Sequence, residues 1–161
     1  INSMKYLIDR AYEKNMKIVL NPSPITDRIK EFDYEKIDLV LVNEHEAASI
    51  SGKKTNDEKI SYFKNTYPNL KIVMTLGSKG SIFIDKNEKI KQDSFKVEAI
   101  DSTGAGDTFT GFFVSQLYQG KDTKEAMEIA SKASALSVTK KGASISIPSL
   151  DDVNNFERKE I

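Results

Sequence analysis

Apolar and polar positions alternate between helical and strand periods along the first part of the chain. From Ser3 to Asn15, apolar residues recur at the spacing of one helix face, so we expect an amphipathic helix. The β-rich run at residues 17–20 then ends at Asn21-Pro22-Ser23-Pro24, because proline removes a backbone donor and stops a central strand. Residues 37–42 are almost continuously apolar, which is typical of a strand buried on both faces.

The same two periods predict the remaining elements. Gly52 closes one helix, and Asn56 or Asp57 opens the next. The order of elements predicts a three-layer α/β/α fold with a mostly parallel sheet, formed as one domain over residues 1–161. An antiparallel hairpin is expected at one sheet edge. Helices are expected over residues 25–32, 44–50, 56–66, 107–119, 123–139 and 149–158, further strands over 71–75, 81–84 and 89–91, and turns over 77–80 and 85–88.

Composition excludes several classes of function. Lys plus Arg and Asp plus Glu are equal at 24 each, so no overall field favours nucleic acid or an anionic membrane. The absence of cysteine excludes disulfides and thiolate catalysis. No apolar run approaches the roughly 18 residues that a membrane span needs. We therefore expect a cytoplasmic protein whose partners are small molecules or copies of itself.

One loop carries the most specific chemistry. Residues 101–106, here called the glycine loop, read Asp-Ser-Thr-Gly-Ala-Gly and run directly into a predicted helix. Gly104 and Gly106 leave no side chain in the way, so backbone N–H groups can converge on an anion at the positive end of the helix. Phosphate is the expected anion.

The carboxylate that follows the glycine loop is unexpected in a loop that only binds phosphate, because like charges repel. A catalytic role explains Asp107: an ionised carboxylate there can accept the proton of an attacking hydroxyl while N–H groups stabilise the transferred phosphoryl group. The alternative is an acidic residue favoured by the helix dipole, beside an ordinary tight turn. The chain has no G-x-x-x-x-G-K-[ST], and Phe109 stands where a dinucleotide fingerprint needs a third small residue.

The glycine loop and Asp107 resemble the D-T-x-G-A-G-D motif of the ribokinase-like, or PfkB, carbohydrate kinases. Four other segments are similar to landmarks of that family, in the same order: residues 20–24 (L-N-P-S-P), 43–46 (N-E-H-E), 75–80 (T-L-G-S-K-G) and 137–148 (S-V-T-K-K-G-A-S-I-S-I-P). The resemblance covers nearly the whole chain. It implies the ribokinase-like fold and an ATP-dependent kinase that acts on a small sugar.

The resemblance also implies a role for each matched residue. Asp107 would be the catalytic base, with an anion hole formed by the amides of Gly104, Ala105, Gly106 and Asp107. Asn43 and Glu46 would organise Mg²⁺ and its waters. The nucleotide would be bound by Asn43, Thr75, Gly77, Ser78, Gly80, Gly106 and Ser131. A monovalent cation, K⁺, would lie between the glycine loop and the last loop, at Asp101, Thr103, Ser137, Lys140, Gly142 and Ser146.

Simpler interpretations stay open for these residues. Glu46 can be a solvated acid in a first helical turn, and residues 75–80 can be a plain turn between strands. Asp101 can be an ordinary loop start, and Lys140 a solvated lysine. His45 is expected to be a surface residue, since zinc needs several N or S donors.

The family's chains are about twice as long as this one. Their first half supplies further strands, a small lid and the sugar-binding residues, so we expect this chain to be the carboxyl-terminal half and to be inactive by itself. An unpaired strand edge then favours association, and we expect a homodimer. Ribose is the favoured sugar, with fructose, fructose phosphate or a nucleoside left open. A non-catalytic nucleotide-binding fragment is the alternative.

Overall fold

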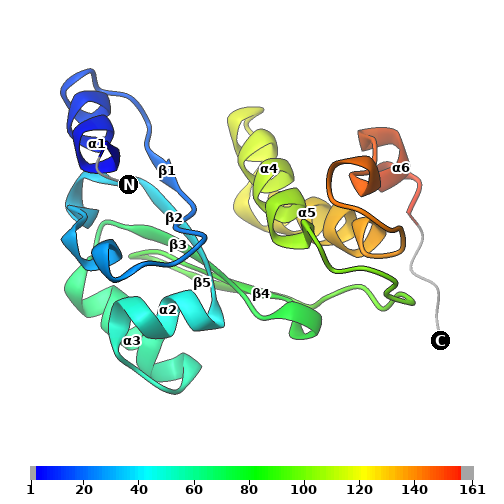
Figure 1. Cartoon of the computed structure of the whole chain (residues 1–161), viewed down its shortest axis with the longest axis horizontal. Coiled ribbons are helices and arrows are strands. Elements are labelled where there is room, and N and C mark those ends of the chain that lie inside the picture. Colours follow the sequence, from blue (N-terminus) through cyan, green and yellow to red (C-terminus); the bar gives the residue numbers. More distant parts are fainter. Residues whose placement is uncertain (1–2, 157–161) are drawn as a thin grey trace. The chain divides into compact units, whose positions relative to one another are not determined.

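A computed structural model of the chain describes residues 3–156, and Figure 1 shows its elements. Contacts divide these residues into two compact units. The first unit contains residues up to Thr75 together with Ile82–Ile90. The second contains Leu76–Ser81 and the chain from Lys91 onward.

The strands form one five-stranded sheet in the order β1-β2-β3-β4-β5. β1, β2 and β3 run parallel, and Asn43 at the end of β2 is the register partner of Thr75 at the end of β3. The hairpin expected at the sheet edge is present, since β4 and β5 are neighbours joined by the turn at residues 85–88. The strands are Val19–Leu20 (β1), Leu39–Asn43 (β2), Lys71–Thr75 (β3), Ser81–Ile84 (β4) and Lys89–Gln92 (β5). The prediction of an α/β fold with a mixed sheet is confirmed.

The first unit also contains three α-helices, α1 (Met4–Glu13), α2 (Glu44–Ser51) and α3 (Asn56–Thr66). Gly52 ends α2 in the left-handed conformation, as predicted. The predicted cap of α3 is wrong: Thr55 caps it, because its hydroxyl accepts the Glu58 amide while the Glu58 carboxylate accepts the Thr55 amide. The short helix predicted over 25–32 is present as a 3-10 helix at Asp27–Glu31, with i to i+3 bonds from the Ile29 amide to the Thr26 carbonyl and from the Phe32 amide to the Ile29 carbonyl.

The second unit is mainly helical. α4 (Ala105–Tyr118) and α5 (Thr123–Ser137) pack against each other, with Phe109 and Phe113 of α4 buried and their rings 6.0 Å apart. Fully buried alanines of α5 allow the two helices to approach closely. The short α6 (Leu150–Asn154) ends earlier than the predicted 149–158, whose last two residues lie outside the described chain.

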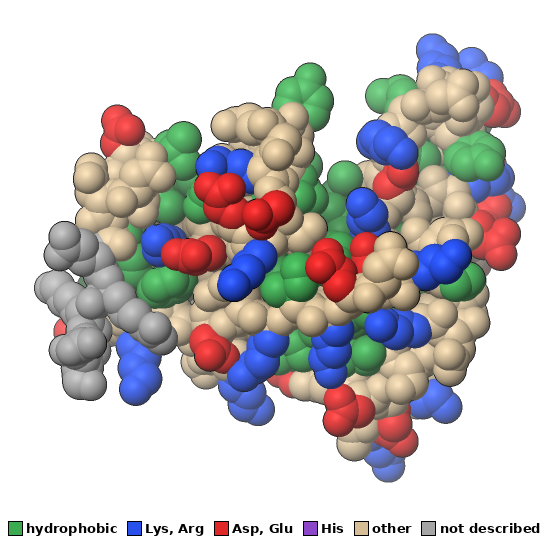
Figure 2. Space-filling view, turned by 180° about the vertical axis from the view of Figure 1, so that it is seen from behind, with side chains coloured by type: hydrophobic (Ala, Val, Ile, Leu, Met, Phe, Trp, Pro, Cys, Tyr) green, Lys and Arg blue, Asp and Glu red, His purple; other side chains and the backbone are tan. Residues whose placement is uncertain are grey.

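The distribution of charged side chains and the apolar character of the helices bear on possible partners. Acidic and basic side chains are interspersed on the face in Figure 2, as the equal numbers of the two charges predict. Within residues 3–156, no helix combines the length and the apolar character that crossing a bilayer requires.

Candidate functional site

The glycine loop turns into α4 at Gly104. This residue is the N-cap and has φ +78°, a left-handed conformation that glycine adopts without strain. The Thr108 amide makes the first intrahelical bond, to the Gly104 carbonyl at 2.8 Å. No side chain caps α4, so its amino-terminal N–H groups are left for another acceptor.

The amides at the start of α4 differ from the expected set in one respect. Ala105 donates its N–H to the Ser102 carbonyl at 3.2 Å, because the loop closes a tight turn there. The N–H groups of Gly104, Gly106 and Asp107 have no acceptor among residues 3–156. A Cβ placed on Gly106 would find no atom within 4 Å, so the space beside its amide is open. An anion could therefore approach the positive end of a helix of 14 residues.

Asp107 lies in the first turn of α4, beside these amides, and is exposed. Its carboxylate forms no ion pair with any residue of the described chain. An exposed carboxylate in this place is accessible to a hydroxyl group of a substrate.

The glycine loop is held against the loop that follows α5, here called the terminal loop (residues 138–149). Asp101 Oδ2 accepts the Gly142 amide at 2.9 Å. Asp101 Oδ1 accepts the amide and the hydroxyl of Thr103, at 2.9 and 2.7 Å. The Gly142 amide, followed by the two donors of Thr103, lowers the pKa of Asp101 to about 2, so this carboxyl is ionised near neutral pH.

The other residues predicted to hold a monovalent cation lie near the same two loops. Ser137 and Ser146 are buried, and their hydroxyls donate to the carbonyls of Ser134 and Ala143, both at 2.8 Å. Their oxygen lone pairs remain able to accept a cation. Lys140 is exposed. Residues 3–156 hold no group of three His, Cys, Asp or Glu side chains, so hydroxyl and carbonyl oxygens would have to complete a cation site around Asp101.

Asn43 and Glu46 form the capping box of α2. Asn43 Oδ1 accepts the amides of His45 and Glu46, and Glu46 Oε2 accepts the Asn43 amide, all at 2.9 Å. Glu46 is only 5% exposed, so the alternative of a solvated first-turn acid is wrong. His45 is exposed, as expected. The carboxylate and amide oxygens are of the type that Mg²⁺ prefers, although each of these side chains already has a structural partner.

The segment after β3 is a 3-10 turn, Gly77–Lys79, closed by a bond of 2.8 Å from the Leu76 amide to the Gly80 carbonyl. Gly77 and Ser78 are exposed, as nucleotide contact would require, whereas Gly80 is buried. Thr75 is half-buried, and its hydroxyl donates to the Val42 carbonyl at 3.5 Å. Asn43 and Thr75 are thus register partners at the ends of two adjacent parallel strands. Of the turn that follows β3, Gly77 and Ser78 are exposed and Gly80 is not.

Sequence reasoning missed the residues that hold the glycine loop in place. Ser134 of α5 donates its hydroxyl to the Ala105 carbonyl at 3.1 Å. The Val138 carbonyl accepts the amides of Ile100 and Asp101, at 2.7 and 3.1 Å. Ser131, for which nucleotide binding is predicted, lies within α5 and is buried. A serine on the inner side of a helix gives no signal in a single sequence, because its partner lies 29 residues away.

Comparisons with known proteins identify relatives. A model of the pfkB family of carbohydrate kinases matches residues 3–150. A ribokinase of Staphylococcus aureus is 41% identical over 141 residues, which are 84% of this chain and 46% of the relative. The structure of a Cryptococcus neoformans ribokinase in complex with ADP has a TM-score of 0.84 and 26% identity, and the match covers 95% of this chain and 57% of that one.

A third similar structure contains both a sugar and a nucleotide. The structure of Arabidopsis thaliana ribokinase with ribose and ATP has a TM-score of 0.79 at 26% identity, over 94% of this chain and 51% of that one. The chain therefore spans about half the length of each of these three relatives. The predicted ribokinase-like fold is confirmed by these structural matches.

Proposed function

Because the chain belongs to the pfkB family of carbohydrate kinases, we propose that it contributes the nucleotide-binding and catalytic half of an enzyme that transfers phosphate from ATP to a sugar hydroxyl. One observation carries the proposal: the uncapped start of α4 offers the unpaired amides of Gly106 and Asp107 beside an exposed carboxylate. Amides aimed at a phosphoryl group and a base beside them are the two requirements of this reaction.

The chain's own residues then have separate tasks. The amides of Gly104, Gly106 and Asp107 would bind the transferred phosphoryl group, and the Asp107 carboxylate would take the proton of the sugar hydroxyl. Gly77 and Ser78 would contact the nucleotide. Residues 1–161 would form a single domain within the larger enzyme. Ribose is the favoured sugar because several of the chain's relatives are ribokinases. A cytoplasmic location is also proposed.

Two cations are part of the proposal. Mg²⁺ would neutralise charge on the ATP phosphates, with Asn43 and Glu46 organising its waters through the oxygens that the capping box leaves available. K⁺ would be held by Asp101 with carbonyl and hydroxyl oxygens of the terminal loop, where Ser137 and Ser146 are buried. The donor set fits a monovalent ion, because it combines one carboxylate with neutral oxygens.

Nucleotide binding can be tested with a pair of glycine variants in α4. A Cβ at Gly106 or at Gly111 meets no atom within 4 Å, so alanine should fit the fold at either position. Only at Gly106 would the methyl group occupy the proposed phosphate site. We expect Gly106→Ala to weaken Mg·ATP binding at least about tenfold, equivalent to one lost charge-assisted hydrogen bond, and Gly111→Ala to leave the affinity unchanged.

Isothermal titration calorimetry on the chain and its two variants measures this difference. Equal affinities in Gly106→Ala and Gly111→Ala would count against a phosphate at the start of α4. A second candidate function, nucleotide binding without catalysis, is favoured for the chain by its span of half the relatives' length. ATP binding without sugar-dependent ADP release would support that candidate for the chain.

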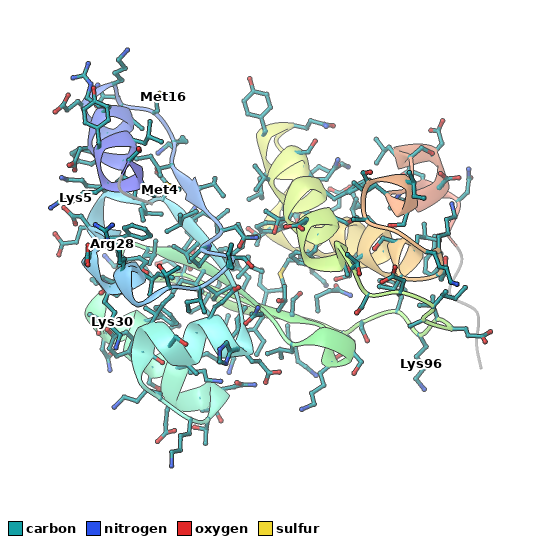
Figure 3. All side chains as sticks on the ribbon, in the orientation of Figure 1. Met4, Lys5, Met16, Arg28, Lys30 and Lys96 are labelled. Atoms are coloured by element: carbon teal, nitrogen blue, oxygen red, sulfur yellow. The ribbon has the colours of Figure 1, made fainter. Side chains whose placement is uncertain are left out.

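We also propose that the chain forms a homodimer through its first unit. β1 is an edge of the sheet, and an open edge favours pairing with another strand. The exposed large apolar side chains of this unit lie in one stretch of sequence, and Figure 3 labels two of them, Met4 and Met16. They are Met4, Tyr6, Leu7, Tyr12, Met16 and Val19.

Multi-angle light scattering over a range of concentrations tests the dimer. Tyr6 in the first unit and Tyr118 in the second are both exposed, at 63% and 93%, and provide a matched pair. We expect Tyr6→Lys to shift the chain toward the monomer, because a charge would be buried in the interface, and Tyr118→Lys to leave the dimer intact. A monodisperse monomer of the unmodified chain at high concentration would contradict the proposal.

A further inference from the structure

Asp101 connects two loops that lie far apart in the sequence. Its Oδ1 atom holds its own loop through Thr103, and its Oδ2 atom accepts the amide of Gly142, 41 residues later, at 2.9 Å. The carboxylate thus has three hydrogen-bond donors, two from the glycine loop and one from the terminal loop. Hydrogen bonds to an ionised acceptor are among the stronger ones in proteins.

The backbone contacts around Asp101 reinforce this connection. A Cβ on Gly104 would lie 3.3 Å from the Ala143 side chain, so the two loops are in direct contact where α4 begins. The Asp101 amide also donates to the Val138 carbonyl at 3.1 Å, at the start of the terminal loop. Because Gly104 is the N-cap of α4, a shift of the terminal loop would reach the amides of Gly106 and Asp107.

We propose that Asp101 is a positioning residue whose carboxylate holds the terminal loop at Gly142 and thereby fixes the start of α4, and that this link forms without a bound cation. Its consequence for phosphate binding rests on the function proposed above, but the link itself does not. The cation role suggested for Asp101 uses the charge of the carboxylate. The link needs no bound ion, because all three donors to the carboxylate belong to this chain.

Amide hydrogen exchange of Gly142 measures the link directly. The ¹⁵N-labelled chain is compared in buffers whose monovalent cation is either choline or potassium. We expect the Gly142 amide to be protected in both buffers. Asp101→Asn should accelerate its exchange about 10- to 100-fold, as expected for the loss of one hydrogen bond to a charged acceptor, because the uncharged asparagine amide would replace the carboxylate.

Asp122→Asn is the matched control. Asp122 is an exposed aspartate of the same unit whose carboxylate accepts one backbone amide, from Glu125 at 2.8 Å, at the start of its own helix. We expect its substitution to leave Gly142 exchange unchanged. Protection of Gly142 only in potassium, or unchanged protection in Asp101→Asn, would overturn the proposal. Should Asp101→Asn not fold, the comparison of choline with potassium on the unmodified chain still decides it.

A second readout separates positioning from a general contribution to stability. Because the link would fix the amides that face the transferred phosphoryl group, Asp101→Asn should weaken Mg·ATP binding more than Mg·ADP binding, a difference that a general loss of stability would not produce. Equal weakening for the two nucleotides would contradict the positioning role. If the unmodified chain binds neither nucleotide, the proposed function fails, whereas Gly142 exchange still decides the link.

Discussion

Replacing Asp107 with asparagine is expected to lower the rate of sugar-dependent ADP release by about 10²–10⁴, the usual cost of removing a well-placed general base. The substitution keeps the shape of the side chain and removes its ability to take a proton at neutral pH. The rate is measured with a coupled assay on the full-length product of the gene, across a panel of sugars. Binding of ATP should change much less, because the amides of the anion hole are retained.

Asp57→Asn provides the control for this prediction. Asp57 is also an acidic residue in the first turn of an α-helix, α3, so both substitutions remove the same interaction with a helix dipole. If Asp107 only stabilises its helix, the two variants should show similar small losses of thermal stability and full activity. Full activity in Asp107→Asn would remove the assignment of this residue as the base.

Replacing Gly80 with alanine is expected to destabilise the chain by about 2–5 kcal/mol in the free energy of unfolding, through overpacking and backbone strain. A Cβ at this position would lie 2.0 Å from the Gln92 carbonyl oxygen and 2.8 Å from Asp93 Cα. Both neighbours are backbone atoms that cannot rotate away. Gly80 also has φ +94°, which disfavours a side chain independently of the available space.

Gly77→Ala separates backbone strain from the steric overlap that a side chain at Gly80 would cause. Gly77 lies in the same turn with φ +56°, but a Cβ there meets no atom within 4 Å. This variant should lose only about 1–2 kcal/mol, from backbone strain alone. Urea denaturation of both variants measures the difference. Midpoints that coincide would show that the contact with Gln92 and Asp93 yields easily, and that Gly80 is not required for packing.

Hydrophobic periodicity and glycine positions in the sequence predicted the strands and helix ends that are determined by nearby residues. Residues 71–75 form the predicted strand, because an apolar run ends at a polar residue and a glycine turn. Gly52 ends α2 as predicted, because a left-handed C-cap favours glycine whatever surrounds it. The short helix expected at 25–32 is a 3-10 helix over Asp27–Glu31, and its type could not be predicted because packing against neighbours decides the geometry of so short a segment.

The sequence predicted which residues belong to the candidate site, but only some of the contacts that these residues make. The glycine loop predicted an open helix start; a Cβ on Gly106 would meet no atom within 4 Å, whereas one on Gly104 would lie 3.3 Å from the Ala143 side chain. The Ala105 amide donates to the Ser102 carbonyl and is therefore not available to an anion. This bond could not be predicted, because it depends on how tightly the loop turns. The contact between Asp101 and Gly142 joins residues 41 positions apart, and a single sequence carries no signal of such a pairing.

The central claim is that the amides at the start of α4 bind the phosphoryl group that ATP transfers. The most direct test is a titration of the ¹⁵N-labelled chain with Mg·ATP and, separately, with Mg·ADP, followed through the amide resonances of Gly104, Gly106 and Asp107. We predict that these resonances shift strongly with ATP and much less with ADP, which lacks the γ-phosphate. Resonances that stay unmoved while others respond to ATP would place the nucleotide elsewhere and contradict the claim.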